Sequence, residues 1–180
     1  MDNEEIIYRV SYRAVKYPRI ELSSTIPLII LPKGMKPELV ISRYKEWLKR
    51  RLNHINKLLT EPPNLILYNR SDEDFISLVY SYIENMSKEL NVKVSKVKFT
   101  KMKTKWGSMN SKQRLSLNLL MKYIPEYHIK YIVYHELCHI LVNCHNKKFY
   151  QLVSLKFMDY KRIKKELNDY WYLILNEETK

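Results

Sequence analysis

The spacing of apolar and polar positions divides the chain into short strands and longer helices. Alternation over residues 6–14 predicts a strand, and residues 19–22 and 28–31 predict two more. A helical period then runs from about residue 37 to residue 59, and Pro37 suits its first position. We expect the apolar stripe of this helix to contain Leu39, Val40, Tyr44, Trp47, Leu48, Leu52, Ile55 and Leu59.

The segment Glu-Pro-Pro-Asn at residues 61–64 interrupts the pattern and is the best candidate for a boundary. Ser71 is placed to cap a helix that reaches about Leu90. Strands are expected near residues 92–99 and 113–118, separated by a polar, lysine-rich loop. An apolar helix ending near residue 141 follows, and then helices over about 146–158 and 159–175.

This order of elements predicts an α+β fold. One domain of residues 1–180 is the default for a chain of this length, which buries about 70% of its unfolded surface. Within it we expect an N-terminal β-rich lobe with the long helix at residues 1–63. A second lobe, at residues 64–180, is expected to hold a mixed or antiparallel sheet and the remaining helices.

The most informative motif is the run from His135 to His139, which reads His-Glu-Leu-Cys-His. On a helix, positions i and i+4 lie above one another, so His135 and His139 can reach one metal ion while Glu136 stands beside it. His145 needs the helix to end and the chain to turn back, and Asn143 tolerates the left-handed conformation that ends helices. Three imidazoles with one open position are typical of catalytic zinc.

Such a pattern also occurs in helices that bind nothing. Here an apolar face buries the segment, and buried histidine and glutamate side chains need partners, which a metal provides. Cys138 points away from the two helical histidines and is best explained as a core residue. Cys144, directly before His145, remains an alternative third ligand, whereas His128 lies two helical turns away and is too distant.

Several segments together resemble the YgjP-like metallopeptidases, a family of zincin-type metal-dependent hydrolases. They are Tyr17–Leu22, Ile29–Gly34, Trp106–Ser108, Leu115–Asn118, Tyr131–His139 and His145–Tyr150. The resemblance covers nearly the whole chain and is most specific in the C-terminal half. Two positions depart from the family: Met109 replaces a common cysteine, and Phe149-Tyr150 replaces a common Phe-Trp pair.

The resemblance implies a zinc metallopeptidase with one Zn²⁺ per chain, held by His135, His139 and His145. A metal-activated water would attack the peptide bond of a peptide or protein substrate, with Glu136 as general base. In a zincin the strand before the metal helix presents its edge to an extended substrate. That strand would be residues 114–118 here.

The net charge of +13, from 32 basic and 19 acidic residues, suggests a nucleic acid or a phosphate-bearing partner. A charge spread evenly over the surface explains it equally well. Two further hypotheses therefore stay open: a metal-dependent phosphohydrolase acting on nucleotides or RNA at the same three histidines, and a basic nucleic-acid-binding module with an inactive site. No apolar run approaches 18 residues and residues 1–5 are acidic, so we expect a cytoplasmic protein without a membrane partner.

Overall fold

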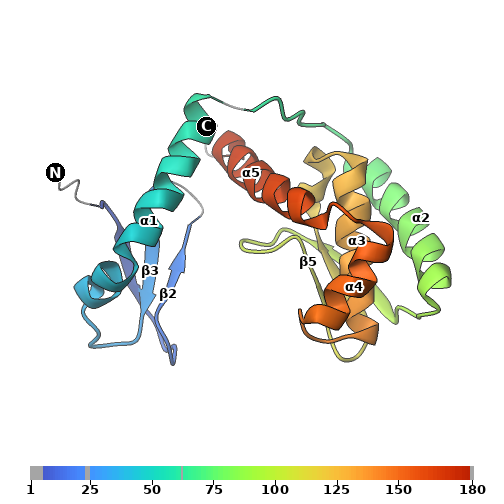
Figure 1. Ribbon diagram of the computed structural model, residues 1–180, viewed down its shortest axis with the longest axis horizontal. Coiled ribbons are helices and arrows are strands. Elements are labelled where there is room, and N and C mark those ends of the chain that lie inside the picture. Colours follow the sequence, from blue (N-terminus) through green and yellow to red (C-terminus); the bar gives the residue numbers. More distant parts are fainter. Residues whose placement is uncertain (1–5, 23–24, 62, 179–180) are drawn as a thin grey trace. The chain divides into compact units, whose positions relative to one another are not determined.

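The structure, a computed structural model, describes residues 6–22, 25–61 and 63–178 (Figure 1). The acidic residues 1–5 lie outside this part. The chain forms two compact units: residues 1–64 with 171–180, and residues 65–170. Each unit contains helices and a small mixed sheet, so the predicted α+β class is confirmed. The assignment of both units to one domain stays a prediction.

The first unit contains a three-stranded sheet of β1 (Arg9–Tyr12), β2 (Arg19–Glu21) and β3 (Leu28–Leu31). Strand β3 is central; it pairs in parallel with β1 and antiparallel with β2. Its residues 29–31 are fully buried, as a central strand of apolar residues should be. The first strand is shorter than the alternation over residues 6–14 predicted.

Helix α1 (Pro37–Thr60) begins with the proline that the sequence placed there. Its first turns pack on β3 through Val40, and its last turns pack on Tyr172 through Ile55 and Leu58. The predicted stripe was too wide, because three of its members are exposed: Leu39, Tyr44 and Trp47. The helix contacts its neighbours along a narrower face than the apolar spacing suggested.

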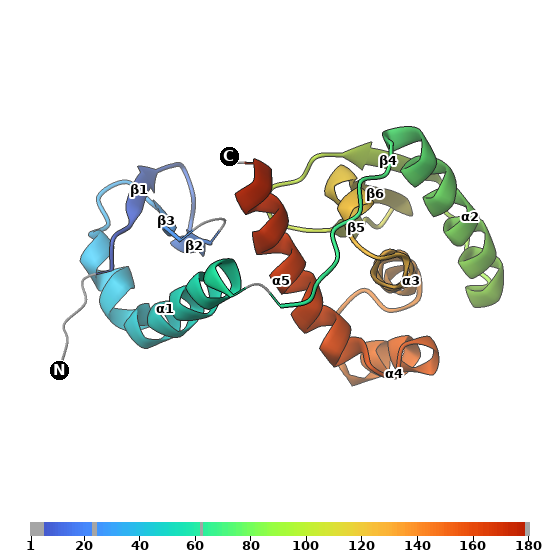
Figure 2. The same ribbon diagram turned by 90° about the horizontal axis from the view of Figure 1, so that it is seen from above.

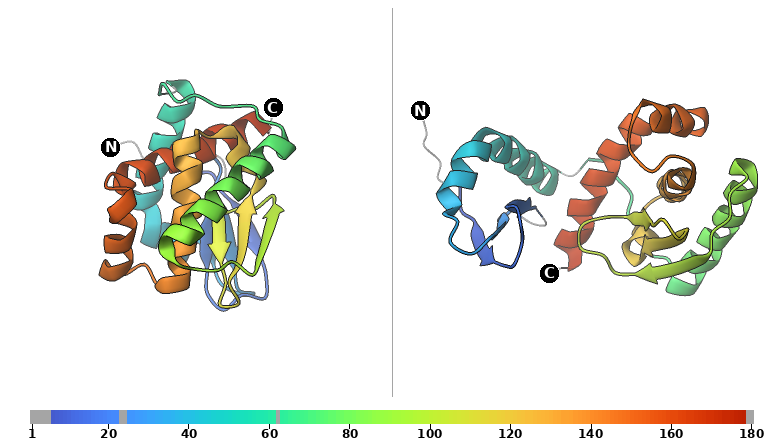
Figure 3. Two further views of the ribbon diagram at one scale, coloured as in Figure 1. Left: turned by 90° about the vertical axis from the view of Figure 1, so that its right-hand side faces the viewer. Right: turned by 90° about the horizontal axis from the view of Figure 1, so that it is seen from below.

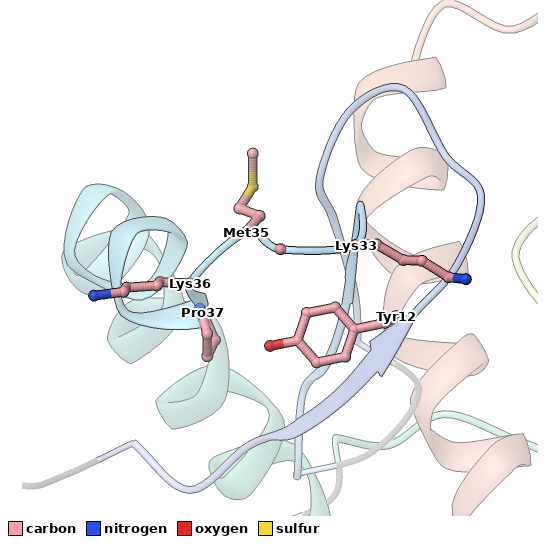
Figure 4. A pocket seen from close by; sticks show the side chains of 6 residues that line it. Tyr12, Lys33, Met35, Lys36 and Pro37 are labelled. Atoms are coloured by element: carbon pink, nitrogen blue, oxygen red, sulfur yellow. The ribbon is translucent and has the colours of Figure 1, made fainter.

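A cavity of about 270 Å³ lies beside the turn between β3 and α1. Its lining residues are Tyr12, Lys33, Gly34, Met35, Lys36 and Pro37. The Tyr12 ring points toward Pro37, while the two lysine side chains extend away from each other (Figure 4). This lining contains no histidine, cysteine or carboxylate, so it offers no set of metal ligands.

The second unit is built around α2 (Asp72–Leu90) and α3 (Glu126–Leu141), which pack side by side (Figure 3). The cap predicted for α2 is confirmed, since the Ser71 hydroxyl accepts a hydrogen bond from the Asp74 backbone N–H at 3.0 Å. Asn91, with φ of 49°, ends this helix. Helix α3 is also contacted by the sheet and by the following helix, which explains why apolar residues surround it (Figure 2).

The sheet of this unit contains β4 (Lys96–Thr100), β5 (Gly107–Met109) and β6 (Arg114–Asn118) in the order β4-β6-β5. Strand β6 is parallel to β4 and antiparallel to β5. The expectation that residues 114–118 present a free edge is therefore wrong, because β6 is the central strand. Strand β5 lies in the segment for which the sequence predicts a loop; it is an edge strand of this sheet and packs on α3.

The remaining elements are a short 3-10 helix at Leu119–Tyr123, α4 (Lys147–Lys156) and α5 (Tyr160–Glu178). The first eleven residues of α5, 160–170, belong to the second unit, and the rest of the helix belongs to the first. Within the described ranges, none of the helices has both the length and the apolar composition that crossing a membrane requires.

Candidate metal centre

Three histidine side chains converge at the C-terminal end of α3. His135 and His139 are one helical turn apart, and His145 follows in the loop that leads to α4. The Nε2 atom of His145 lies 2.9 Å from Nε2 of His135 and 3.0 Å from Nε2 of His139. The structure thus brings together the three predicted ligands, and the group is arranged so that it could hold a metal ion.

The end of α3 also orients one of these rings. The Nδ1 atom of His139 lies 3.2 Å from the carbonyl oxygen of Val142, so an Nδ1–H donor leaves the Nε2 lone pair free for a metal. Val142 is in an extended conformation, with φ of −140° and ψ of 103°. The expected left-handed Asn143 is wrong, since Asn91 and Gln113 are the non-glycine residues with positive φ in the described part.

The histidines are held in the neutral form that binds metals. Burial lowers the pKa of His135 to about 3, and the neighbouring His139 and His145 contribute to the decrease. Burial also lowers the pKa of His139 and of His145. Since a metal competes with protons for imidazole nitrogen, these shifts favour metal binding at neutral pH.

Aromatic rings enclose the cluster. The buried Phe149 ring lies within 4.8 Å of the ring centroids of all three histidines. The Tyr150 ring stacks on His145 at 6.0 Å, and the Tyr160 ring stacks on Tyr150 at 5.1 Å. The column Tyr160–Tyr150–His145, which we call the aromatic stack, supports the one histidine that does not lie on α3.

Glu136 lies beside the histidines and is 7% exposed. Burial raises the pKa of its carboxyl to about 7, and this rise is opposed by the backbone N–H of Met109 and by the charge of Lys105. A carboxyl in this range can accept and return a proton near neutral pH. A Cβ atom added to Gly107 would lie 2.8 Å from Cγ of Glu136, so only glycine lets β5 approach this side chain.

Asn118 fixes the segment that precedes β5. Its side chain is fully buried; Nδ2 donates to the carbonyl oxygens of Met102 and Lys105, each at 2.9 Å. Its own backbone N–H donates to the carbonyl oxygen of Trp106 at 2.8 Å. These bonds tie the Lys105–Trp106 segment to the end of β6, and therefore hold β5 in place against α3.

The histidines and Glu136 open into a cleft of about 490 Å³. One side is formed by β5 and the turn after it, and the other by the end of α3 and the loop beyond. The lining residues are Gly107, Ser108, Met109, Asn110, Ser111, His135, Glu136, His139, Asn143 and His145. All of them belong to the second unit, so the site does not depend on the placement of the first.

The cysteines and the further histidine that the sequence offers as alternative metal ligands lie outside the cluster. Cys138 is buried, as expected of a core residue. Cys144 is exposed, and its Sγ atom accepts a hydrogen bond from Nδ2 of Asn146 at 3.2 Å. His128 is more buried than a polar residue at a helix start would be, because its Nε2 atom pairs with Glu166 at 2.8 Å.

Sequence reasoning missed the residues that support the cluster from elsewhere in the chain. Tyr160 and Lys164 lie on α5, and their roles depend on contacts that no local spacing reveals. Gly107 had a usable signal: it is one of only two glycines in 180 residues. A glycine in so glycine-poor a chain marks a position where the backbone conformation or a close approach requires it.

Comparison with known families decides the relationship. Residues 6–170 match the family model described as the YgjP-like, metallopeptidase domain. The chain belongs to the YgjP-like metallopeptidase family. The matched region includes the histidine cluster, Glu136 and the sheet beside them, and membership of the family supports a metal-dependent hydrolase.

Two solved structures are similar to about half of this family member. The metallopeptidase zymogen abylysin of Pyrococcus abyssi is 20% identical with a TM-score of 0.46, and the match covers 49% of this chain and 90% of that chain. The metallopeptidase zymogen jannalysin of Methanocaldococcus jannaschii is 24% identical with a TM-score of 0.46, covering 49% and 92% respectively. None of the curated proteins matches the sequence.

Proposed function

We propose that the protein is a zinc-dependent peptidase with one Zn²⁺ per chain, bound by His135, His139 and His145. The observation that carries this proposal is the convergence of three imidazole Nε2 atoms beside a buried carboxylate. The cleft is open to solvent and bordered by a strand edge, which suits a peptide or protein substrate. Membership of a metallopeptidase family supports the same assignment.

The donor set fits zinc. Zinc–imidazole bonds are about 2.0–2.1 Å long, so two nitrogens of a tetrahedral site lie about 3.3 Å apart. The observed Nε2 separations of 2.9 and 3.0 Å are close to this spacing. Three neutral nitrogen ligands leave one position open, as in catalytic rather than structural zinc sites.

The chemistry that zinc supplies when bound is polarisation of the scissile carbonyl and acidification of a coordinated water. Glu136 is the group that accepts a proton and returns it to the leaving amine. Its pKa of about 7 is matched to both roles at neutral pH, because the carboxyl can exist in either form. The Met109 backbone N–H and the close approach of Gly107 hold this carboxyl in one orientation.

The substrate is proposed to lie along β5. Within the described part of the chain, β5 pairs with β6 on one side and has no strand on the other. An extended peptide can add to such an edge through backbone hydrogen bonds, which place a peptide bond in the cleft without reading its side chains. This assigns to β5 the role that the sequence suggested for residues 114–118.

The decisive experiment compares the wild-type protein with Glu136→Gln. We expect the variant to retain one zinc per chain and to lose turnover of an unfolded protein substrate, because the amide cannot accept the proton. The role of general base is typically worth about 10²–10⁴-fold in rate. Metal analysis and proteolysis of the same two samples test this, and an active Glu136→Gln protein would remove Glu136 from the mechanism.

A metal-dependent phosphohydrolase is the second candidate. The observation in its favour is that Lys105 and Lys164 lie close enough to act electrostatically on Glu136 and on the histidines. Nucleotide and RNA substrates are therefore tested beside the protein substrate. Glu136-dependent phosphate release without proteolysis would favour this candidate, whereas no metal and no turnover would favour a basic nucleic-acid-binding module with an inactive site.

A further inference from the structure

The lining of the cleft contains few acidic groups. Among the residues that the structure describes, Glu136 is the only acidic one in the lining, and its carboxyl has the proposed role of general base. The rest of this lining consists of glycine, serine, methionine and asparagine residues and the three histidines. Substrate side chains therefore meet no fixed negative charge on the cleft surface beyond the reacting centre.

Two lysines lie near this lining: Lys164 on α5, and Lys105 in the segment before β5. On α5, Nζ of Lys164 donates a hydrogen bond to the Tyr150 hydroxyl at 3.2 Å, and the Tyr150 ring stacks on His145. On the segment before β5, Lys105 is held by the bond from Asn118 Nδ2 to its carbonyl oxygen. Both side chains come from exposed positions, so their ammonium groups remain available to a substrate.

The segment that forms the sheet beside the cleft is also rich in positive charge. Residues 90–125 contain no acidic residue, but they contain nine basic ones: Lys93, Lys96, Lys98, Lys101, Lys103, Lys105, Lys112, Arg114 and Lys122. Three acidic groups elsewhere in the unit form ion pairs with basic side chains. Asp159 and Glu166 contact Arg162, and Glu89 contacts Lys156.

We propose that this protein selects peptide substrates with acidic side chains near the scissile bond, and that Lys105 and Lys164 are the residues that determine this specificity. The inference rests on the proposed peptidase function, because it names the substrate class of the same cleft. Lys105 lies two residues before Gly107, which approaches Glu136, and Lys164 on α5 contacts Tyr150, whose ring stacks on His145. Each therefore governs the charge preference at a different substrate position.

The expected effect follows from the exposure of the two lysines. Ion pairs between solvent-exposed groups are worth about 0.2–1 kcal/mol, which corresponds to as much as about fivefold in affinity. Several acidic residues add their effects, and a basic residue at the same position is disfavoured to a similar degree. Because these charges are exposed, the preference weakens as the ionic strength rises.

The test uses quenched-fluorescence peptides of one sequence that differ only in the residues flanking the scissile bond: acidic, neutral or basic. The zinc-loaded wild-type protein is expected to cleave the acidic peptide with a kcat/KM about two- to fivefold higher per acidic residue than the neutral one. The basic peptide is expected to be the poorest substrate. Binding of the same peptides to Glu136→Gln, measured by fluorescence anisotropy, gives a readout that does not depend on turnover.

Two pairs of variants identify the residues responsible. Lys105→Glu and Lys164→Gln should each reduce the preference, at different substrate positions; the glutamine retains a donor for Tyr150. Lys93→Glu and Lys165→Gln are the matched controls, because they make the same charge changes at exposed positions without a contact to the cluster. Zinc content is measured for each protein to confirm that the site is intact.

The outcomes separate this inference from the proposed function. Equal cleavage and equal binding of the three peptides would overturn the inference and leave the peptidase assignment standing. A charge preference that survives both Lys105→Glu and Lys164→Gln would overturn the assignment of these lysines. Charge-dependent binding to Glu136→Gln without cleavage by the wild-type protein would refute the peptidase function, and with it the inference, and would leave only a site that binds acidic peptides.

Discussion

The two halves of the histidine cluster are built differently. His135 and His139 lie on the buried helix α3, where a spacing of four residues is sufficient to align them. His145 lies in an exposed loop, and its ring is supported by Tyr150 and Phe149, which follow it in sequence. The Tyr150 ring is in turn supported by Tyr160 of α5.

This difference shows which contacts fix the position of each histidine side chain. The helical pair depends on local backbone geometry, so any change that preserves α3 preserves the pair. The loop histidine depends on contacts between α4, α5 and the loop, which form only when the unit is folded. The loop is therefore the part of the site that substitutions at a distance can disturb.

The largest effect is expected when a histidine itself is removed. His139→Ala and His145→Ala should both lose stoichiometric zinc, because two imidazoles hold a metal ion far more weakly than three. The loss should exceed the 10–100-fold that removal of an outer hydrogen-bond partner typically causes. Zinc content after dialysis measures this, and stoichiometric zinc in His139→Ala would refute the assignment of the ligands.

The same histidine variants can sharpen the comparison between the helix and the loop. Cys144→Ser removes the alternative ligand beside His145 without changing the size of the residue. We expect Cys144→Ser to bind zinc as the wild-type protein does, since the Cys144 side chain is exposed and lies outside the three-histidine group. Zinc loss in Cys144→Ser together with retention in His145→Ala would reverse the assignment of the third ligand.

The next largest effect is expected at β5, which packs on the helix that carries His135 and His139. Gly107→Ala would place a Cβ atom 2.8 Å from Cγ of Glu136, so either β5 or the carboxyl must move. Displacement of a reacting group by about 1 Å can reduce the rate by about 10²-fold. We expect a decrease of this order in kcat/KM with zinc binding unchanged, measured by steady-state proteolysis and metal analysis.

Gly34 is the matched control for this change. It has φ of +84°, and no atom lies within 4 Å of an added Cβ. Gly34→Ala should therefore strain the backbone and lower the stability by about 1–2 kcal/mol, while it leaves kcat/KM unchanged. If Gly34→Ala and Gly107→Ala reduced activity equally, general destabilisation rather than the contact with Glu136 would be the cause.

A smaller effect is expected from the aromatic stack. Tyr160→Ala removes the ring that supports Tyr150, which widens the range of positions that His145 can adopt. We expect zinc affinity to fall by about tenfold, at the lower end of the range for outer partners of a metal ligand. Competition with a fluorescent chelator measures the affinity. Tyr80→Ala, which removes a ring contact with Phe99 away from the cluster, should leave the affinity unchanged.

The features that depend on local spacing could be predicted from the sequence. The helix that carries His135 and His139, the Ser71 cap and the burial of β3 all follow from neighbouring residues. The sequence also predicted the position of His145 near the helical pair, because six residues are enough for the chain to turn back. These predictions concern short segments whose conformations are set by few contacts.

Features that depend on tertiary pairing could not be predicted. Strand β5 has three residues, two of which are glycine and serine, so its strand conformation comes from pairing with β6 rather than from propensity. The central position of β6 likewise depends on a parallel pairing with β4, from which it is separated in sequence by β5. The support of Tyr150 by Tyr160 joins residues whose relation only the packing of α5 reveals.

The smallest expected effect concerns His128, the histidine of α3 that is not part of the cluster. Burial lowers its pKa below the ordinary value of 6.5, although the paired Glu166 opposes the shift. The unfolded chain therefore binds a proton at pH values where the folded chain does not. The stability contributed by neutral His128 is present above pH 6.5 and is lost as the pH falls below that value.

His128→Gln should remove this dependence, because glutamine does not titrate and can still donate to Glu166. Urea unfolding of the metal-free proteins at pH 8 and at pH 5.5 measures the free energies. We expect the stability of the wild-type protein to fall more than that of the variant between these two values. Parallel decreases would assign the acid sensitivity to the cluster histidines instead, whose pKa values are also lowered but which contact one another rather than a carboxylate.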